Sequence, residues 1–304
     1  MHSVKPDFSK GVAYVGGRYV PIDEAGIPIL DLGFTRSDAT YDVVHLWNGR
    51  FFRLNEHIER FERSMAKVRM TLPVSRAELR EVLSECVRLS SLRDAYVEMI
   101  CTRGRFAAGS RDPRLARNAF YAFAIPFVWI ADPEKQKTGL SLRISPVPRI
   151  HPDSVDPTAK NFHWLDFTRG LFDAFDKADE TAVLTDGKGN VDEGPGFNIF
   201  IVKDGALATP AAGMFEGITR RSIIELARAA GRRAEERTVS AEEVRQADEV
   251  FATSTAGGVM PIVRVDGVAV GSGRPGPITL DLHQRYWDSH SDPAWSEAVD
   301  DDAG

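Results

Sequence analysis

Hairpin patterns dominate the start of the chain. Apolar residues flank a Gly-Gly pair within residues 12–20 and an Asn-Gly pair within residues 43–54. Such dipeptides accept the positive φ angles of tight turns, so each stretch predicts two antiparallel strands joined by a short loop. The Asn-Gly pair gives the stronger signal, because it favours a type I′ turn.

The hydrophobic period then changes to that of helices. Apolar residues recur every three or four positions from Ile58 to Val68 and again from Leu79 to Cys86, which predicts two amphipathic helices. Residues 95–102 and 119–129 predict further strands. Together these elements indicate an α+β unit with helices on one side of a mostly antiparallel sheet.

The second half repeats the mixture of strands and helices. A strand near residues 140–147, a proline-rich loop and a helix over residues 163–175 are expected first. Asp-Gly pairs at 186–187, 204–205 and 266–267 lie between apolar residues and predict hairpins. Two more helices are predicted at residues 218–230 and 241–247. The second begins with the capping-box pattern Ser240 and Glu243.

A charged, proline-containing stretch at residues 131–139 separates the two halves and predicts an interdomain linker. We therefore expect a two-domain α+β fold, with a small domain over residues 1–130 and a larger one over residues 140–304. The acidic tail after Trp295 is expected to be disordered.

Composition narrows the function classes. The 304 residues carry a net charge of −6, which argues against a nucleic-acid or anionic-membrane partner. The two cysteines have no CxxC spacing, so neither a disulfide framework nor a metal site is expected. The start of the chain lacks the apolar core of a signal peptide, and the apolar stretch 119–131 is too short to span a bilayer. We expect a soluble, cytoplasmic protein.

Three segments of the second half suggest chemistry. Lys160 lies between a proline-bearing loop and a helix, and a lysine in a partly apolar site is suited to form a Schiff base. Glu193 is followed by glycines that allow a flat ligand to approach, and its carboxylate could face a pyridinium nitrogen. Gly217 precedes a helix whose first amides could bind phosphate. Taken singly, these segments are more commonly a surface lysine, a glycine turn and an ordinary helix start.

In this order the segments resemble the fold-type-IV pyridoxal-phosphate (PLP) enzymes, whose fold is that of D-amino-acid aminotransferase. The resemblance runs from about Gly17 to Trp287 and is greatest to the (R)-selective amine transaminases. It implies that Lys160 carries PLP as a Schiff base and is the catalytic residue. It also implies a homodimer and a cofactor in the cleft between the domains. The cofactor-binding residues that it implies besides Lys160 are Arg60, Glu193, Phe215, Ile218, Thr219, Thr255 and Ala256.

The resemblance also implies a substrate pocket lined by Tyr41, Val43, Tyr96, Glu98 and Trp164. The chain departs from the related amine transaminases at two positions that concern the acceptor carboxylate. Arg36 stands where they usually have histidine, and glycine stands at position 109, near which they place an arginine. We expect Arg36, Arg105 or Arg111 to bind the carboxylate instead, because a guanidinium can bind it bidentately. The alternative for Arg36 is a solvated position at a strand end.

The expected reaction moves an amino group from an (R)-amine to a keto acid such as pyruvate, with a 1,3-proton transfer by Lys160. A D-amino-acid aminotransferase is the first alternative, since a carboxylate-binding Arg36 would favour such donors. An L-branched-chain aminotransferase, an aminodeoxychorismate-lyase-like PLP enzyme and a non-catalytic PLP-binding protein are further alternatives. The fold alone does not decide among them.

Overall fold

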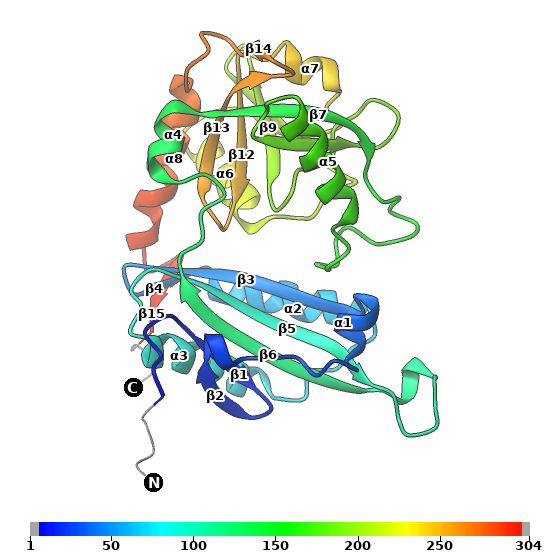
Figure 1. Ribbon diagram of the computed structural model, residues 1–304. Helices are drawn as coiled ribbons and strands as arrows, with labels where there is room; N and C mark the ends of the chain where they lie inside the picture. Colours follow the sequence, from blue (N-terminus) through cyan, green and yellow to red (C-terminus); the bar gives the residue numbers. More distant parts are fainter. Residues whose placement is uncertain (1–5, 300–304) are drawn as a thin grey trace. The chain divides into compact units, whose positions relative to one another are not determined.

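The computed structural model describes residues 6–299, which fall into two compact units (Figure 1). Unit 1 contains the described residues up to Val128, the segment Ala159–Phe162 and the described residues from His290 onward. Unit 2 contains Trp129–Thr158 and His163–Ser289. The division thus lies near the boundary expected at residue 130, but two later segments return to unit 1.

Unit 1 is built on a seven-stranded sheet with the strand order β15-β4-β3-β5-β6-β1-β2. Every pairing along this order is antiparallel, which agrees with the sheet predicted from the sequence. The strands are β1 (Val12–Val15), β2 (Arg18–Pro21), β3 (Ala39–Trp47), β4 (Arg50–Phe52), β5 (Ala95–Arg105), β6 (Arg117–Pro126) and β15 (Ser296–Ala298). Between β3 and β4, Asn48 and Gly49 both have positive φ angles, of 51° and 78°, as a type I′ turn requires.

The two predicted amphipathic helices of unit 1 are α2 (Leu54–Lys67) and α3 (Arg76–Ser90). Their apolar sides bury Phe61 and Leu83 against Val44 and Val97 of the sheet, in the main core of the unit. The short helix α1 (Leu32–Arg36) was not predicted. It begins where the buried carboxylate of Asp31 accepts a hydrogen bond from the amide of Gly33.

The prediction of a disordered tail is wrong for residues 296–299. Strand β15 pairs with β4 at the edge of the sheet, where Figure 1 shows the two side by side, and Val299 is buried. The amide of Arg53 also donates to the carbonyl oxygen of Trp295 at 2.7 Å. Main-chain pairing with a distant strand, invisible in a local pattern, orders this part. Asp300, Asp301 and Asp302 lie outside the described residues.

Unit 2 is built on an eight-stranded sheet with the order β11-β10-β9-β12-β13-β7-β8, and β14 pairs with β13. This sheet is mixed, because β7 lies parallel to both β8 and β13, and β10 lies parallel to β11. The strands are β7 (Leu140–Pro148), β8 (Thr181–Thr185), β9 (Asn198–Lys203), β10 (Ala206–Thr209), β11 (Ala234–Glu236), β12 (Glu249–Ser254), β13 (Gly258–Val265) and β14 (Val268–Ala269).

The helices of unit 2 only partly follow the predictions. Those expected are α5 (Leu165–Asp176), α6 (Ile218–Ala229) and α7 (Ala241–Arg245), and α7 has the predicted capping box. Two were not predicted: α8 (Pro277–Asp288) and α4 (Pro133–Thr138), which occupies the expected linker. At residues 186–190 a longer loop replaces the expected two-residue hairpin turn. The loop is held because the carboxylate of Asp186 accepts hydrogen bonds from the backbone amides of Lys188 and Asn190.

No helix in the described part of the chain is long and apolar enough to cross a membrane.

Candidate active site

The predicted site residues occur in both units. Unit 1 holds Arg36, Tyr41, Val43, Arg60, Tyr96, Glu98, Arg105, Arg111 and Lys160; unit 2 holds Trp164, Glu193, Phe215, Ile218, Thr219, Thr255 and Ala256.

The backbone of Lys160 is fixed to the sheet of unit 1. Its carbonyl oxygen accepts hydrogen bonds from the amide of Tyr41 at 3.3 Å and from the hydroxyl of Thr40 at 2.6 Å. Its amide donates to the hydroxyl of Ser64 at 3.3 Å, and Asn161 forms a β-bridge with Thr40. The lysine is therefore anchored on both sides of its α-carbon, which leaves the long side chain as its movable part.

Four predicted pocket residues share one face of this sheet with the lysine. Val43 lies directly opposite Glu98 across the β3–β5 pair, and Tyr41 and Tyr96 lie two residues away from them along their own strands. Side chains two residues apart project from the same face of a strand. The ammonium nitrogen of Lys160 lies 4.6 Å from the centroid of the Tyr41 ring, on which Phe162 stacks at 4.2 Å. This face is mostly aromatic and apolar.

Glu98 is the acidic group of this face. Its side chain accepts a hydrogen bond from the Tyr96 hydroxyl at 3.2 Å, and the residue is only 7% exposed. Burial raises the pKa of Glu98 to about 7, although the nearby charge of Lys160 acts in the opposite direction. Burial and the neighbouring Glu98 likewise raise the pKa of Tyr96 far above its usual value. Glu98 can therefore gain or lose a proton near neutral pH.

Arg60 lies at the opposite face of β3, in a buried ion pair that was not predicted from the sequence. Its Nε and Nη2 atoms donate to the two oxygens of Asp42 at 2.7 and 2.8 Å, and His57 Nδ1 lies 2.8 Å from Asp42 Oδ1. Burial alone would raise the pKa of Asp42, but Arg60 and His57 hold it well below its usual range. The sequence did hold a hint of this ion pair, because Asp42 is a charged residue within the otherwise apolar strand segment 41–44. The role of Arg60 in cofactor binding stays a prediction.

The three candidate carboxylate-binding arginines are exposed and occur near one end of β5. Arg36 ends helix α1, and its guanidinium carbon lies 5.0 Å from the centroid of the Phe106 ring. Arg105 ends β5, and Arg111 belongs to the segment that joins β5 to β6. Arg36 therefore contacts the segment that begins after Arg105 and contains Arg111. Its role in carboxylate binding stays a prediction.

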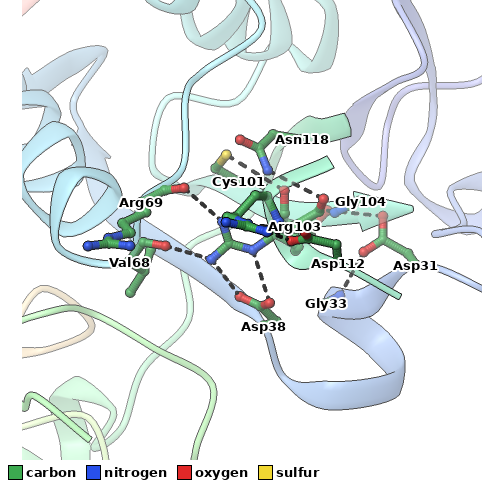
Figure 2. Close-up of polar contacts among 12 residues, drawn as sticks. Asp31, Gly33, Asp38, Val68, Arg69, Cys101, Arg103, Gly104, Asp112 and Asn118 are labelled. Carbon is green, nitrogen blue, oxygen red and sulfur yellow. Dashed lines mark hydrogen bonds and ion pairs between the residues drawn. The ribbon is translucent and has the colours of Figure 1, made fainter. Parts of the chain in front are cut away.

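Figure 2 shows how the base of that segment is held. The guanidinium of Arg103 donates to both oxygens of Asp38, at 3.0 and 3.1 Å, and to the carbonyl oxygens of Val68 and Arg69. At the next residue, Gly104 has a φ of +70°, and a Cβ atom there would lie 1.8 Å from a backbone oxygen of β6. The end of β5 is therefore tied to both the start of β3 and the end of α2.

In unit 2, Glu193 accepts hydrogen bonds at both of its carboxylate oxygens. Its Oε2 accepts a hydrogen bond from the amide of Phe215 at 2.9 Å, and its Oε1 accepts one from Arg149 at 3.0 Å. Arg149 also donates to Asp166. Neither Arg149 nor Asp166 was predicted from the sequence, because no local pattern marks them. The backbone of Phe215 is thus fixed, while its predicted contact with the cofactor stays a prediction.

The predicted phosphate-binding residues are at the start of helix α6. The N-cap residue of the helix is Gly217, which has no side chain. No capping side chain therefore accepts hydrogen bonds from the amides of Ile218 and Thr219 in the first turn. The Thr219 hydroxyl lies 3.2 Å from that of Tyr286. The guanidinium of Arg220, next to Thr219, donates to the carbonyl oxygen of Pro210 and pairs with Glu236.

The two remaining groups of predicted residues in unit 2 have partners within that unit. Between β12 and β13, the amide of Ala256, which follows Thr255, donates to the hydroxyl of Ser254 at 3.1 Å. Trp164 precedes helix α5 and packs edge-on against Phe167, with the ring centroids 5.4 Å apart. Their roles toward phosphate and substrate stay predictions.

These groups suit PLP chemically. Lys160 offers an amine to the aldehyde, Glu193 offers a carboxylate to the ring nitrogen, and the uncapped helix start offers amides to the phosphate. Among the described residues, no cluster of three or more His, Cys, Asp or Glu could hold a metal ion.

Comparison with known proteins decides the family. Residues 39–265 match the family described as amino-transferase class IV. The chain belongs to the class IV aminotransferases. It is 34% identical to the D-alanine aminotransferase of Listeria monocytogenes, over 90% of this chain and 93% of the relative. It is also 34% identical to the branched-chain-amino-acid aminotransferase of Pseudomonas aeruginosa, over 78% of each chain.

Solved structures confirm the fold of this class IV aminotransferase. The branched-chain amino acid aminotransferase of Escherichia coli matches with a TM-score of 0.89 and 26% identity, over 95% of this chain and 99% of that chain. Another branched-chain amino acid aminotransferase, solved in complex with N-(5'-phosphopyridoxyl)-L-glutamate, matches with a TM-score of 0.88 and 27% identity. That match covers 96% of this chain and 100% of the other. The predicted two-domain α+β fold and the PLP cofactor are both confirmed for this enzyme.

Proposed function

We propose that this class IV aminotransferase transfers the amino group of an (R)-amine to a keto acid such as pyruvate. The observation that carries the proposal is the surface around Lys160, where aromatic rings surround a buried carboxyl, that of Glu98. Above about pH 7, where Glu98 is mostly ionised, its carboxylate repels a carboxylate on the donor, and aromatic rings pack well against an apolar substituent. Both features favour amines over amino acids. The (R) hand rests on the resemblance to the amine transaminases.

The chain's own residues would act in distinct ways. The Lys160 amine binds the cofactor and later takes up and returns the proton that leaves the donor carbon. PLP, when bound, supplies an aldehyde that receives the amino group and a ring that accepts electrons. Glu193 would bind the ring nitrogen, and Arg60, Ile218, Thr219, Thr255 and Ala256 would bind the phosphate. Arg36, Arg105 or Arg111 would bind the acceptor carboxylate, so neutralising the right one should raise the Michaelis constant for pyruvate.

A half-reaction tests the donor class. The PLP-loaded enzyme is mixed with (R)-1-phenylethylamine, with its (S) form or with D-alanine, and loss of the cofactor's visible absorbance is followed. Rapid loss with the (R)-amine and a slow response to the other two are expected. If none of the three donors bleaches the cofactor, the proposed reaction is wrong.

A D-amino-acid aminotransferase is the second candidate. It is favoured by the similarity to the D-alanine aminotransferase of Listeria monocytogenes and by the contact of Arg36 with the β5–β6 segment. In the same experiment, bleaching by D-alanine alone would select this candidate and make Arg36 the first residue to test for carboxylate binding.

We also propose that the enzyme is a homodimer. Ile29, Leu30 and Phe34 are 74%, 68% and 69% exposed within six residues of one another in sequence, and monomers rarely expose such apolar groups together. Light scattering should give twice the chain mass, and Leu30→Asp should reduce it. Val268→Asp, at an exposed apolar residue of unit 2, serves as the control and should leave the mass unchanged.

A cytoplasmic location is proposed as well. Cys86 and Cys101 are buried free thiols, which suits a reducing compartment. Cell fractionation with an antibody to the protein would test the location.

A further inference from the structure

Arg149 is held between two carboxylates in unit 2. It donates to Asp166 through Nη1 and to Glu193 Oε1 through Nη2, the latter at 3.0 Å, and its guanidinium lies 4.0 Å from the centroid of the Phe167 ring. The side chains of Arg149 and of both acids are at most 10% exposed. The side chain of Asp166 is itself fixed, because it accepts hydrogen bonds from the backbone amides of Ile150 and Phe167 at 2.9 and 2.8 Å. The backbone thus orients Asp166, which orients Arg149, which orients Glu193.

Both oxygens of Glu193 accept hydrogen bonds from within the chain. Oε1 accepts from Arg149, and Oε2 accepts from the amide of Phe215 at 2.9 Å. An ionised carboxylate can accept at both oxygens, whereas a protonated one must use an oxygen to donate. Hydrogen bonds to the charged form of an acid favour that form. Glu193 is therefore held as a carboxylate, able only to accept from a further partner.

A third acidic residue, Asp192, is next to Glu193 in the sequence. Arg149 pairs with the carboxylates of Asp166 and Glu193 and not with that of Asp192 in the ion pairs of this group. Burial, with Asp186 and Glu193 nearby, raises the pKa of Asp192 to about 7, so Asp192 is expected to take up a proton near neutral pH.

We propose that Arg149 is a positioning residue that keeps Glu193 ionised and aimed, and so keeps the proton shared with bound PLP on the ring nitrogen. This inference rests on the proposed function, since it requires Glu193 to face that nitrogen. Arg149 acts on Glu193 more than on the ring, because it binds the carboxylate directly. Without the charge of Arg149, the proton would be expected to move from the ring nitrogen of bound PLP to an oxygen of Glu193. The N–H bond would break, an O–H bond would form, and both groups would be neutral.

The experiment uses the enzyme loaded with PLP labelled with ¹⁵N in the ring, whose NMR shift reports whether the nitrogen is protonated. The wild type should show a protonated nitrogen whose signal does not change between about pH 6 and about pH 9. An opposite charge at this distance changes a carboxyl pKa by about 1–3 pH units, so Arg149→Gln should shift the proton toward Glu193 about tenfold or more. Arg149→Lys, which keeps the charge, should restore much of the protonated signal.

Arg143→Met is the matched control, since Arg143 belongs to β7 and pairs with Asp173 and Asp266 instead. It should leave the nitrogen signal unchanged. A nitrogen signal in Arg149→Gln equal to that of the wild type at every pH, or a nitrogen that titrates in the wild type, would overturn the role of Arg149. A titrating wild-type nitrogen overturns it even if Arg149→Gln does not fold. Failure of the wild type to bind PLP or to react with any donor would instead overturn the proposed function.

Discussion

Replacing Glu98 by glutamine should change how the stability of the protein depends on pH. Burial raises the pKa of Glu98 from an ordinary value of 4.5 to about 7. Between these values the unfolded chain has lost the Glu98 proton while the folded protein keeps it. The free energy of unfolding therefore falls as the pH rises through this window. At about 1.4 kcal/mol per pH unit, the full loss is about 3 kcal/mol.

Glutamine removes the titration and keeps the local geometry. Its side-chain oxygen can still accept the hydrogen bond of the Tyr96 hydroxyl, which in the wild type is 3.2 Å from Glu98. Glu98→Gln should therefore be the more stable protein at about pH 8, and the advantage should largely disappear at about pH 5. The variant should at the same time react more slowly or less selectively with amines. That result would show that Glu98 lowers the unfolding free energy but supports the reaction.

Urea denaturation of the cofactor-free protein at several pH values measures this effect. The informative quantity is the difference in unfolding free energy between variant and wild type, because contributions of other titrating groups cancel in it. Asp192→Asn provides a second case, since the pKa of Asp192 is also raised to about 7 by burial. If wild type and Glu98→Gln lost stability in parallel from acid to alkaline pH, Glu98 would not titrate in this range and the reasoning would be refuted.

Two further predictions concern buried contacts of unit 1. Asp42→Asn removes the carboxylate that pairs with the buried guanidinium of Arg60, and it should lower the unfolding free energy by about 3–5 kcal/mol. Denaturant titration measures this change, and a loss under about 1 kcal/mol would contradict a buried ion pair. Gly104→Ala places a methyl group 1.8 Å from the carbonyl oxygen of Arg117 at a φ of +70°. It should cost about 1–3 kcal/mol and speed amide exchange between β5 and β6, whereas unchanged exchange would show that the strands adapt freely.

The fold could be predicted where the signals were local. The Asn48-Gly49 turn and the capping box at Ser240 depend on neighbouring residues, and both formed as expected. Helix α8 was missed because its buried residues, Thr279, Leu282 and Tyr286, make a narrow and partly polar stripe. The pairings of β7 with β8 and β13 join strands far apart in sequence, which no hydrophobic period can reveal.

The candidate site shows the same limit. Lys160 and Glu193 stood out because each occurs in a distinctive short segment, in an order typical of a family. Arg149 did not, because its partners lie 17 and 44 residues away and nothing in its own neighbourhood marks it. The raised pKa of Glu98 is likewise a property of burial, which depends on the assembled sheet. Local segments marked the residues that are expected to touch the chemistry, whereas Arg149 and Asp166, which hold Glu193, needed the structure.

The pairing of β15 with β4 has a consequence for biosynthesis. One of the two outer strands of the unit 1 sheet is residues 296–298. The ribosome makes this strand only after all of unit 2, since unit 2 ends at Ser289. Until then β4 is an unpaired edge, and such edges can pair with other chains. Nascent or prematurely terminated chains should therefore aggregate through this edge. Fusion partners placed close behind residue 299 would hinder the last step of folding.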